Sequence, residues 1–163
     1  MLNIENFNAS TTNWIGLWTL FTKETTRFLK VFYQTVLAPV VTNILFLTVF
    51  LIVIDRDDFV VGGVSYSEFL VPGLIMMQIL QNAFMNTSST IMISKVQGNI
   101  VDILLPPLSN LELTIALSFG GVARGMIVGL ASTIALYFFI DMKFINIFYI
   151  IFFSFSGSLS LSL

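Results

Sequence analysis

Four long apolar stretches follow one another along the chain, separated by short polar segments. They run from about Val36 to Ile54, Phe69 to Ile93, Leu111 to Ile140, and Phe144 to Leu163. An α-helix rises about 1.5 Å per residue, so each stretch is long enough to cross a hydrocarbon core of roughly 30 Å. The pattern predicts an all-α integral membrane protein whose transmembrane domain occupies residues 36–163.

A helical pattern with two different sides precedes the first apolar stretch, over residues 13–35, and follows a polar leader at residues 1–12. Aromatic residues lie along one side of this helix and basic residues along the opposite side. Such a helix lies in the membrane interface, with its rings among the acyl chains and its bases near lipid phosphate. A helix covering a soluble core has the same pattern, but the apolar remainder of the chain decides against it. The expected anchors are Trp14, Trp18, Lys23, Arg27 and Lys30.

Composition supports lipid as the main solvent of the chain and narrows its chemistry. Of the 163 residues, 56% are hydrophobic and 10% are charged, and there is no Cys or His. Soluble domains usually carry about 25% charged residues. Disulfides, thiol nucleophiles, Cys/His zinc sites and Ser-His-Asp catalysis are therefore excluded. A formal net charge of −2 gives no reason to expect nucleic acid as a partner.

The basic residues predict the orientation. Lys23, Arg27, Lys30 and Lys95 fall on one side of the four spans, and Arg56 and Lys143 fall on the other. Because basic residues concentrate on the cytoplasmic side, we expect the N-terminus and the loop at residues 95–110 to be cytoplasmic. The acidic segment at residues 55–58 then faces outward.

The second apolar stretch carries polar residues on one helical face. They are Gln78, Asn82, Asn86 and Ser89. Amides in hydrocarbon need partners, so this stripe should face other helices or a wet cavity. Hydrogen bonding between helices and the lining of a substrate path are both open interpretations.

The third stretch combines a glycine ridge with an arginine. Gly121, Gly125 and Gly129 are spaced so that two helix backbones can approach closely. Arg124 lies in the same stretch, and an arginine inside a membrane is costly enough to be a functional candidate. The alternative is that its side chain reaches the cytoplasmic headgroups.

The spans carry no catalytic or energy-coupling group. No carboxylate or His lies deep in a span, which disfavours a proton-coupled transporter. There is also no Gly-rich phosphate-binding loop for ATP. We therefore expect no enzyme activity and no cofactor in this chain, and any uphill transport must draw its energy from another subunit.

The loop at residues 95–110 has the pattern of a short amphipathic helix. Ile100, Ile103 and Leu104 fall on one side, and prolines end it. Ser109 and Glu112 make a capping box that opens the third span. A short helix between two spans suits contact with a peripheral partner, although its apolar residues would also suit burial among lipid headgroups.

This loop resembles that of the ABC-2 type permeases, the membrane subunits of ABC exporters. The similar residues are Lys95, Gly98, Asn99, Asp102, Leu104, Leu105, Pro107, Leu108, Ser109 and Glu112, with Gly120 to Gly125 further along. The resemblance implies that a partner-contacting coupling helix includes Gly98, Ile100, Asp102, Ile103, Leu104, Pro107 and Ser109. Because family members have six spans and this chain has four, the chain is expected to be truncated at its C-terminus.

The resemblance also implies a function and a set of partners. Two such subunits would form a homodimer in the bacterial inner membrane, surrounded by lipid, and pair with ATP-binding cassette subunits that hold ATP and Mg. The expected cargo is a lipid, a glycan or a drug-like molecule. A passive channel or carrier and a membrane scaffold protein are the alternative functions, because neither needs an ATP-binding partner.

The predicted orientation is testable by labelling single cysteines, because the chain has no native Cys. A Cys in place of Asp57 should react with a membrane-impermeant maleimide in intact cells. A Cys in place of Asn99 should react only after the membrane is permeabilised. Labelling of position 57 from the cytoplasmic side alone would overturn this topology.

Overall fold

The computed structural model describes residues 13–53, 60–61, 64–139 and 146–163. The expected leader at 1–12, the acidic loop residues 55–58 and the link at 141–143 lie outside these residues. The elements are α1 (Trp14–Lys30), the π-helical turn η2 (Tyr33–Leu37), α2 (Ala38–Val53), β1 (Val60–Val61), β2 (Val64–Ser65), α3 (Tyr66–Val96), α4 (Val101–Leu104), α5 (Asn110–Tyr137) and α6 (Ile147–Ser162).

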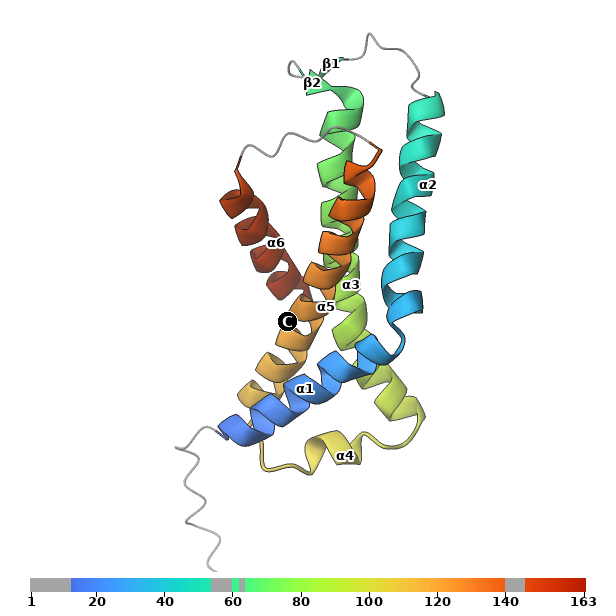
Figure 1. The fold of residues 1–163 in the computed structure, drawn as a ribbon. Coiled ribbons are helices and arrows are strands. Elements are labelled where there is room, and N and C mark those ends of the chain that lie inside the picture. The colour runs from blue at the N-terminus through green and yellow to red at the C-terminus, as the bar shows by residue number, and fades with distance from the viewer. Residues whose placement is uncertain (1–12, 54–59, 62–63, 140–145) are drawn as a thin grey trace, which may run out of the picture.

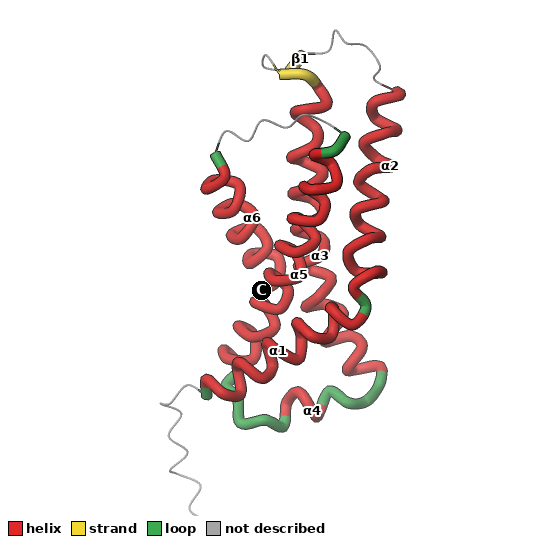
Figure 2. Tube along the Cα trace, viewed as in Figure 1, coloured by secondary structure: helices red, strands yellow, loops and turns green. Residues whose placement is uncertain are grey.

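The long helices form a bundle with α3 and α5 side by side at its centre (Figure 1). α2 and α6 flank this pair, and α1 lies obliquely across one end of the bundle. α4 lies at the same end, and the antiparallel pair β1–β2 lies at the opposite end. Figure 2 shows that helix makes up nearly all of the described chain, as expected for an all-α membrane protein.

The glycine ridge of α5 packs directly on α3. A Cβ added at Gly125 would lie 2.8 Å from the carbonyl oxygen of Ile79, and one added at Gly121 would lie 2.8 Å from that of Ala83. At Gly129 the added atom would meet the Ile79 side chain. Only glycine leaves room for this backbone approach, which maximises van der Waals contact between the two helices.

The helix α6 brings a row of small residues to the same centre. Ser154, Ser158 and Ser162 are buried at four-residue spacing. The hydroxyl of Ser118 on α5 donates to the carbonyl oxygen of Ser162 at 3.2 Å. Small side chains that bond their own or a neighbouring backbone allow close packing in lipid without leaving polar atoms unpaired.

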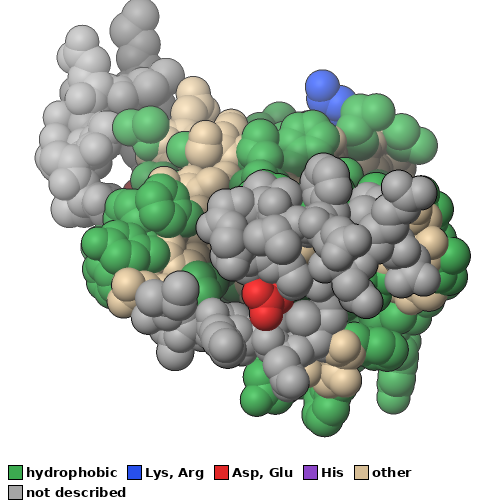
Figure 3. Space-filling view, turned by 90° about the horizontal axis from the view of Figure 1, so that it is seen from above, with side chains coloured by type: hydrophobic (Ala, Val, Ile, Leu, Met, Phe, Trp, Pro, Cys, Tyr) green, Lys and Arg blue, Asp and Glu red, His purple; other side chains and the backbone are tan. Residues whose placement is uncertain are grey.

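Within the described ranges, three helical segments are long and apolar enough to cross a membrane: Tyr33–Val53, Glu68–Val96 and Asn110–Tyr137. Large apolar side chains cover their outer faces, including Leu45, Ile52 and Phe84. Among the described atoms in the end-on view of Figure 3, hydrophobic side chains predominate. Such a surface suits contact with lipid, because large exposed apolar patches are unfavourable in water.

The fourth expected span corresponds to a shorter helix. α6 has 16 residues, which at about 1.5 Å per residue is roughly 24 Å. The expectation of a helix throughout residues 144–163 therefore differs from the structure at its N-terminal end, where Asn146 precedes the helix in an extended conformation.

The junction between α1 and α2 is a π-helical turn rather than a simple boundary near residue 35. Pro39 has no N–H to donate to the carbonyl oxygen four residues earlier, so the hydrogen-bond register changes at this point. The turn buries Thr35 and Val36 and redirects the chain from the oblique α1 into α2.

The glycine contact predicts a difference between two Gly→Ala variants. Gly125→Ala should lower the free energy of unfolding by about 1–3 kcal/mol, because its new methyl group overlaps the Ile79 carbonyl. Gly73→Ala adds the same methyl group to α3 where nothing lies within 4 Å, and should be neutral or stabilising. Thermal unfolding in a neutral detergent measures both. Equal midpoints for the two variants would rule out a close contact at Gly125.

Candidate functional site

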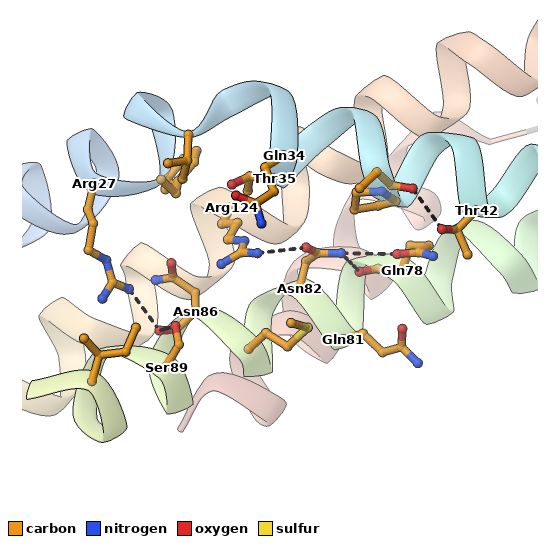
Figure 4. Close-up of a pocket in the computed structure, with 16 residues that line it drawn as sticks. Arg27, Gln34, Thr35, Thr42, Gln78, Gln81, Asn82, Asn86, Ser89 and Arg124 are labelled. Atoms are coloured by element: carbon orange, nitrogen blue, oxygen red, sulfur yellow. Dashed lines mark hydrogen bonds between the residues drawn. The ribbon is translucent and has the colours of Figure 1, made fainter. Parts of the chain in front are cut away.

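A polar groove lies between α3 and the segment that runs from α1 through η2 into α2. Its volume is about 590 Å³. Figure 4 shows polar side chains from α3 on one wall, Gln34 and Thr35 of η2 on the other, and Arg124 of α5 reaching between them. The groove lies toward the bundle end that carries α1 and α4.

The polar stripe predicted on the second span lines this groove. Gln78, Asn82, Asn86 and Ser89 all contribute to its wall. The side-chain amide of Asn82 donates to the carbonyl oxygen of Gln78 at 3.0 Å and to its Oε1 at 3.2 Å. Ser89 donates to the carbonyl oxygen of Asn86. These bonds join residues of α3 to one another and do not tie the stripe to another helix. The stripe therefore faces the groove as well as its neighbouring helices.

Arg124 joins the stripe from the neighbouring helix. Its Nη2 donates to Oδ1 of Asn82 at 3.4 Å, while its buried Nε has no hydrogen-bond partner. Among the described residues, no carboxylate lies within ion-pair distance of Arg124. The side chain therefore brings a positive charge without an ion-pair partner to the groove, rather than extending alone toward the helix end.

An ion pair between Glu24 and Arg27 holds α1 against α3 and α5. The sequence analysis did not identify Glu24 as a functional or structural residue. Glu24 is only 2% exposed, and its Oε2 lies 3.0 Å from Nη2 of Arg27. The Thr90 hydroxyl lies 2.7 Å from the same carboxylate oxygen and is positioned to donate to it. Arg27 also donates to Thr90 and to the carbonyl oxygen of Asn86. A glycine at position 120 makes room, because a Cβ there would lie 3.0 Å from Cβ of Glu24.

The position of Glu24 was the available signal for this cluster. It is an acid three residues before Arg27 in a helix otherwise rich in bases, which is the spacing of a helical ion pair. Of the five expected interface anchors, Trp14, Trp18, Lys23 and Lys30 are exposed, whereas Arg27 turns inward. The seam that α1 buries runs through Leu20, Glu24 and Phe28 instead.

The loop between α3 and α5 contains a shorter helix than its sequence pattern suggests. α3 ends at Val96, and Gly98 in the turn that follows is left-handed, with φ of 73°, while α4 has four residues. Ile100 and Ile103 are half-buried, whereas Leu104 and Leu105 are 63% and 73% exposed. Asp102 and Pro107 are also exposed. Of the three apolar residues expected on one side, Leu104 is the one that faces outward.

The end of this loop fixes the starts of two helices. The backbone N–H of Ser109 donates to Oε2 of Glu112, and the N–H of Glu112 donates back to the Ser109 hydroxyl, as the capping box predicts. The N–H of Asn13, the N-cap of α1, donates to Oε1 of the same carboxylate at 2.7 Å. One side chain thus ties α1 to α5.

No group of His, Cys, Asp or Glu side chains among the described residues could hold a metal ion. The groove contains amides, hydroxyls and guanidinium groups, which bind by donating and accepting hydrogen bonds.

Comparison with known proteins identifies the class. Residues 16–163 match the model of the ABC-2 type transporter family. The inner membrane transport permease YadH of Escherichia coli K12 is 35% identical to the chain over 130 residues, which cover 80% of the chain and 51% of that protein. YadH of Shigella flexneri matches with the same identity and coverage. No solved structure matches significantly.

The bundle of long apolar helices defines an integral membrane protein. Within that class, the chain belongs to the ABC-2 type transporter family. It spans about half the length of the curated relatives it matches.

The buried cluster predicts a selective effect of removing one hydroxyl. Thr90→Val should cost about 1–3 kcal/mol, because the buried Glu24 carboxylate loses a donor. Thr48→Val removes a hydroxyl that bonds only its own helix and faces outward, so it should change stability by at most about 0.5 kcal/mol. Both Trp residues lie on α1, so tryptophan fluorescence during unfolding reports on this helix. Indistinguishable unfolding curves would mean that the hydroxyl does not hold α1.

Proposed function

We propose that the chain is part of the permease subunit of an ATP-driven exporter in a bacterial inner membrane. It contributes to the translocation path of a lipid, glycan or drug-like substrate, and a separate ATP-binding subunit supplies the energy. Membership of the ABC-2 type transporter family supports this proposal, as does the similarity to inner membrane transport permeases. ATP and Mg would be held by the partner.

The observation that carries the proposal is the exposed apolar surface of the loop between α3 and α5. Val101, Leu104 and Leu105 are exposed there, on a segment too short to cross the membrane itself. Apolar side chains exposed together on a loop are typical of a contact surface. In our proposal, this surface seats in a cleft of the ATP-binding subunit on the cytoplasmic side, with Asp102 at the polar rim.

The position of the loop explains how a movement of the ATP-binding subunit would be transmitted to the translocation path. The loop connects α3 and α5 directly, and the Gly121 and Gly125 contacts hold these helices backbone to backbone. A displacement of the loop would therefore move both helices together. Arg124 of α5 and Asn82 of α3 both face the groove, so its walls would move with them.

Pairing with a second permease subunit completes the proposal. The polar groove is lined by α1, η2, α2, α3 and one residue of α5, and a second copy facing it would enclose a polar path between two subunits. Each copy would bring its own loop to its own ATP-binding subunit. Nucleotide-driven closure would then open the path to alternate sides of the membrane.

Introducing a charge on the exposed loop tests the partner contact. Leu104→Glu, made in the complete gene product and co-expressed with the ATP-binding subunit, should reduce co-purification of that subunit about tenfold or more, because a buried apolar anchor is worth about 1–3 kcal/mol. Insertion into the membrane should be unchanged, because the spans are untouched.

Asn99→Glu is the matched control. It adds the same charge to the same loop at an exposed polar position, so it should retain most of the partner. Full retention of the ATP-binding subunit by Leu104→Glu would contradict the proposed contact. Equal loss in both variants would mean that any added charge on the loop weakens binding, and that Leu104 is not a specific anchor.

A further inference from the structure

We infer that the polar groove binds the phosphate-bearing headgroup of an anionic amphiphile. The inference deepens the proposed function, on which it rests, by naming the class of cargo. Polar side chains from α1, η2, α2, α3 and α5 line the groove, and its volume of about 590 Å³ falls in the range of small-molecule sites.

The charge of the groove is the first support. Arg124 and Arg27 both line it, from different helices (Figure 4). Glu24 offsets the charge of Arg27, whereas Arg124 has no carboxylate within ion-pair distance among the described residues. A guanidinium without a counter-ion is costly at membrane depth. Its planar donors match the oxygens of phosphate, which would supply the missing negative charge.

Unused hydrogen-bonding groups are the second support. Asn86 is fully buried and lines the groove, yet neither its Oδ1 nor its Nδ2 has a partner. The Nε of Arg124 is also buried without an acceptor. Buried polar atoms are nearly always paired, so these atoms indicate that a ligand completes them. Nδ2 of Asn86 and Nε of Arg124 are donors without acceptors, which an anion would supply, and Oδ1 of Asn86 is an acceptor that needs a hydroxyl or another donor of the ligand.

The rest of the lining explains why the anion belongs to an amphiphile. Val31, Met85 and Ile93 also line the groove and are exposed. They place apolar surface next to the guanidinium and amide groups, and large apolar side chains cover most of the outer faces of the helices. A molecule with a phosphate and an attached hydrocarbon chain satisfies both kinds of surface, whereas a free anion satisfies only one.

A comparison of three ligands tests the inference on the unaltered chain in a neutral detergent. Dihexanoyl phosphatidate carries both the phosphate and the acyl chains, dihexanoylglycerol lacks the phosphate, and inorganic phosphate lacks the chains. Native mass spectrometry with titration should show phosphatidate binding about tenfold or more tightly than either of the others.

Two variants locate the binding. Arg124→Gln removes the unpaired charge and keeps a side chain that can still donate to Asn82, and it should weaken phosphatidate binding about tenfold. Ser89→Phe fills the groove without changing any charge and should weaken binding as well. Lys30→Gln is the control, because it removes an exposed base of α1 that does not line the groove.

Several outcomes would overturn the inference. Equal affinity for phosphatidate and dihexanoylglycerol would mean that the groove does not recognise phosphate. Inorganic phosphate binding as tightly as phosphatidate would assign the site to a free anion and remove the amphiphile. If Lys30→Gln weakened binding as much as Arg124→Gln, the lipid would be bound at the helix surface. Groove variants that changed only the oligomeric state would assign the surface to a second copy.

The measurement is independent of the coupling proposal. It contains no ATP-binding subunit, so a failure to bind phosphatidate leaves the Leu104 contact untouched, and a failed co-purification leaves the groove's ligand untouched. Ligand discrimination by the unaltered chain also remains informative if a variant does not fold.

Discussion

The backbone contact between α3 and α5 sets the geometry on which the other features depend. The carbonyl oxygens of Ile79 and Ala83 lie only 2.8 Å from where a Cβ at Gly125 or Gly121 would be. In lipid there is little hydrophobic drive to bring helices together, so close packing supplies the association. Arg124, one residue before Gly125, is thereby held within hydrogen-bonding distance of Asn82 on the facing helix. A wider spacing of the two helices would separate these groups.

Those features that depend on local periodicity could be predicted from the sequence. The apolar stretches predict the helices, the three-to-four residue spacing predicts one polar face on α3, and Ser109 with Glu112 predicts the start of α5. The contacts between the elements could not be predicted, because they depend on how the folded helices are placed relative to one another. Nothing local indicates that Arg27 turns toward Thr90 or that the side of α4 bearing Leu104 faces outward.

Glu24 illustrates how one buried charge changes the interpretation of a whole helix. A helix that lay at the membrane interface without packing on the bundle would keep its carboxylate in water, because burying an unpaired carboxylate costs several kcal/mol. Here the carboxylate has Arg27 as its counter-ion and the Thr90 hydroxyl as a neighbouring donor. The seam of Leu20, Glu24 and Phe28 therefore docks α1 on the bundle and leaves Trp14 and Trp18 exposed for lipid.

The two arginines that line the groove differ in the partners that they have within the chain. Arg27 is neutralised by an acid of its own helix, and it bonds to Thr90 and to the backbone of Asn86, so its role in holding α1 is complete within the chain. Arg124 shares the same groove but has only an amide oxygen for a partner, beside an Asn86 side chain with none. A packing role alone would favour a neutral residue at that position, or a carboxylate within reach of the guanidinium. The asymmetry between the two arginines therefore assigns the structural task to the first and leaves the second available to an anionic ligand.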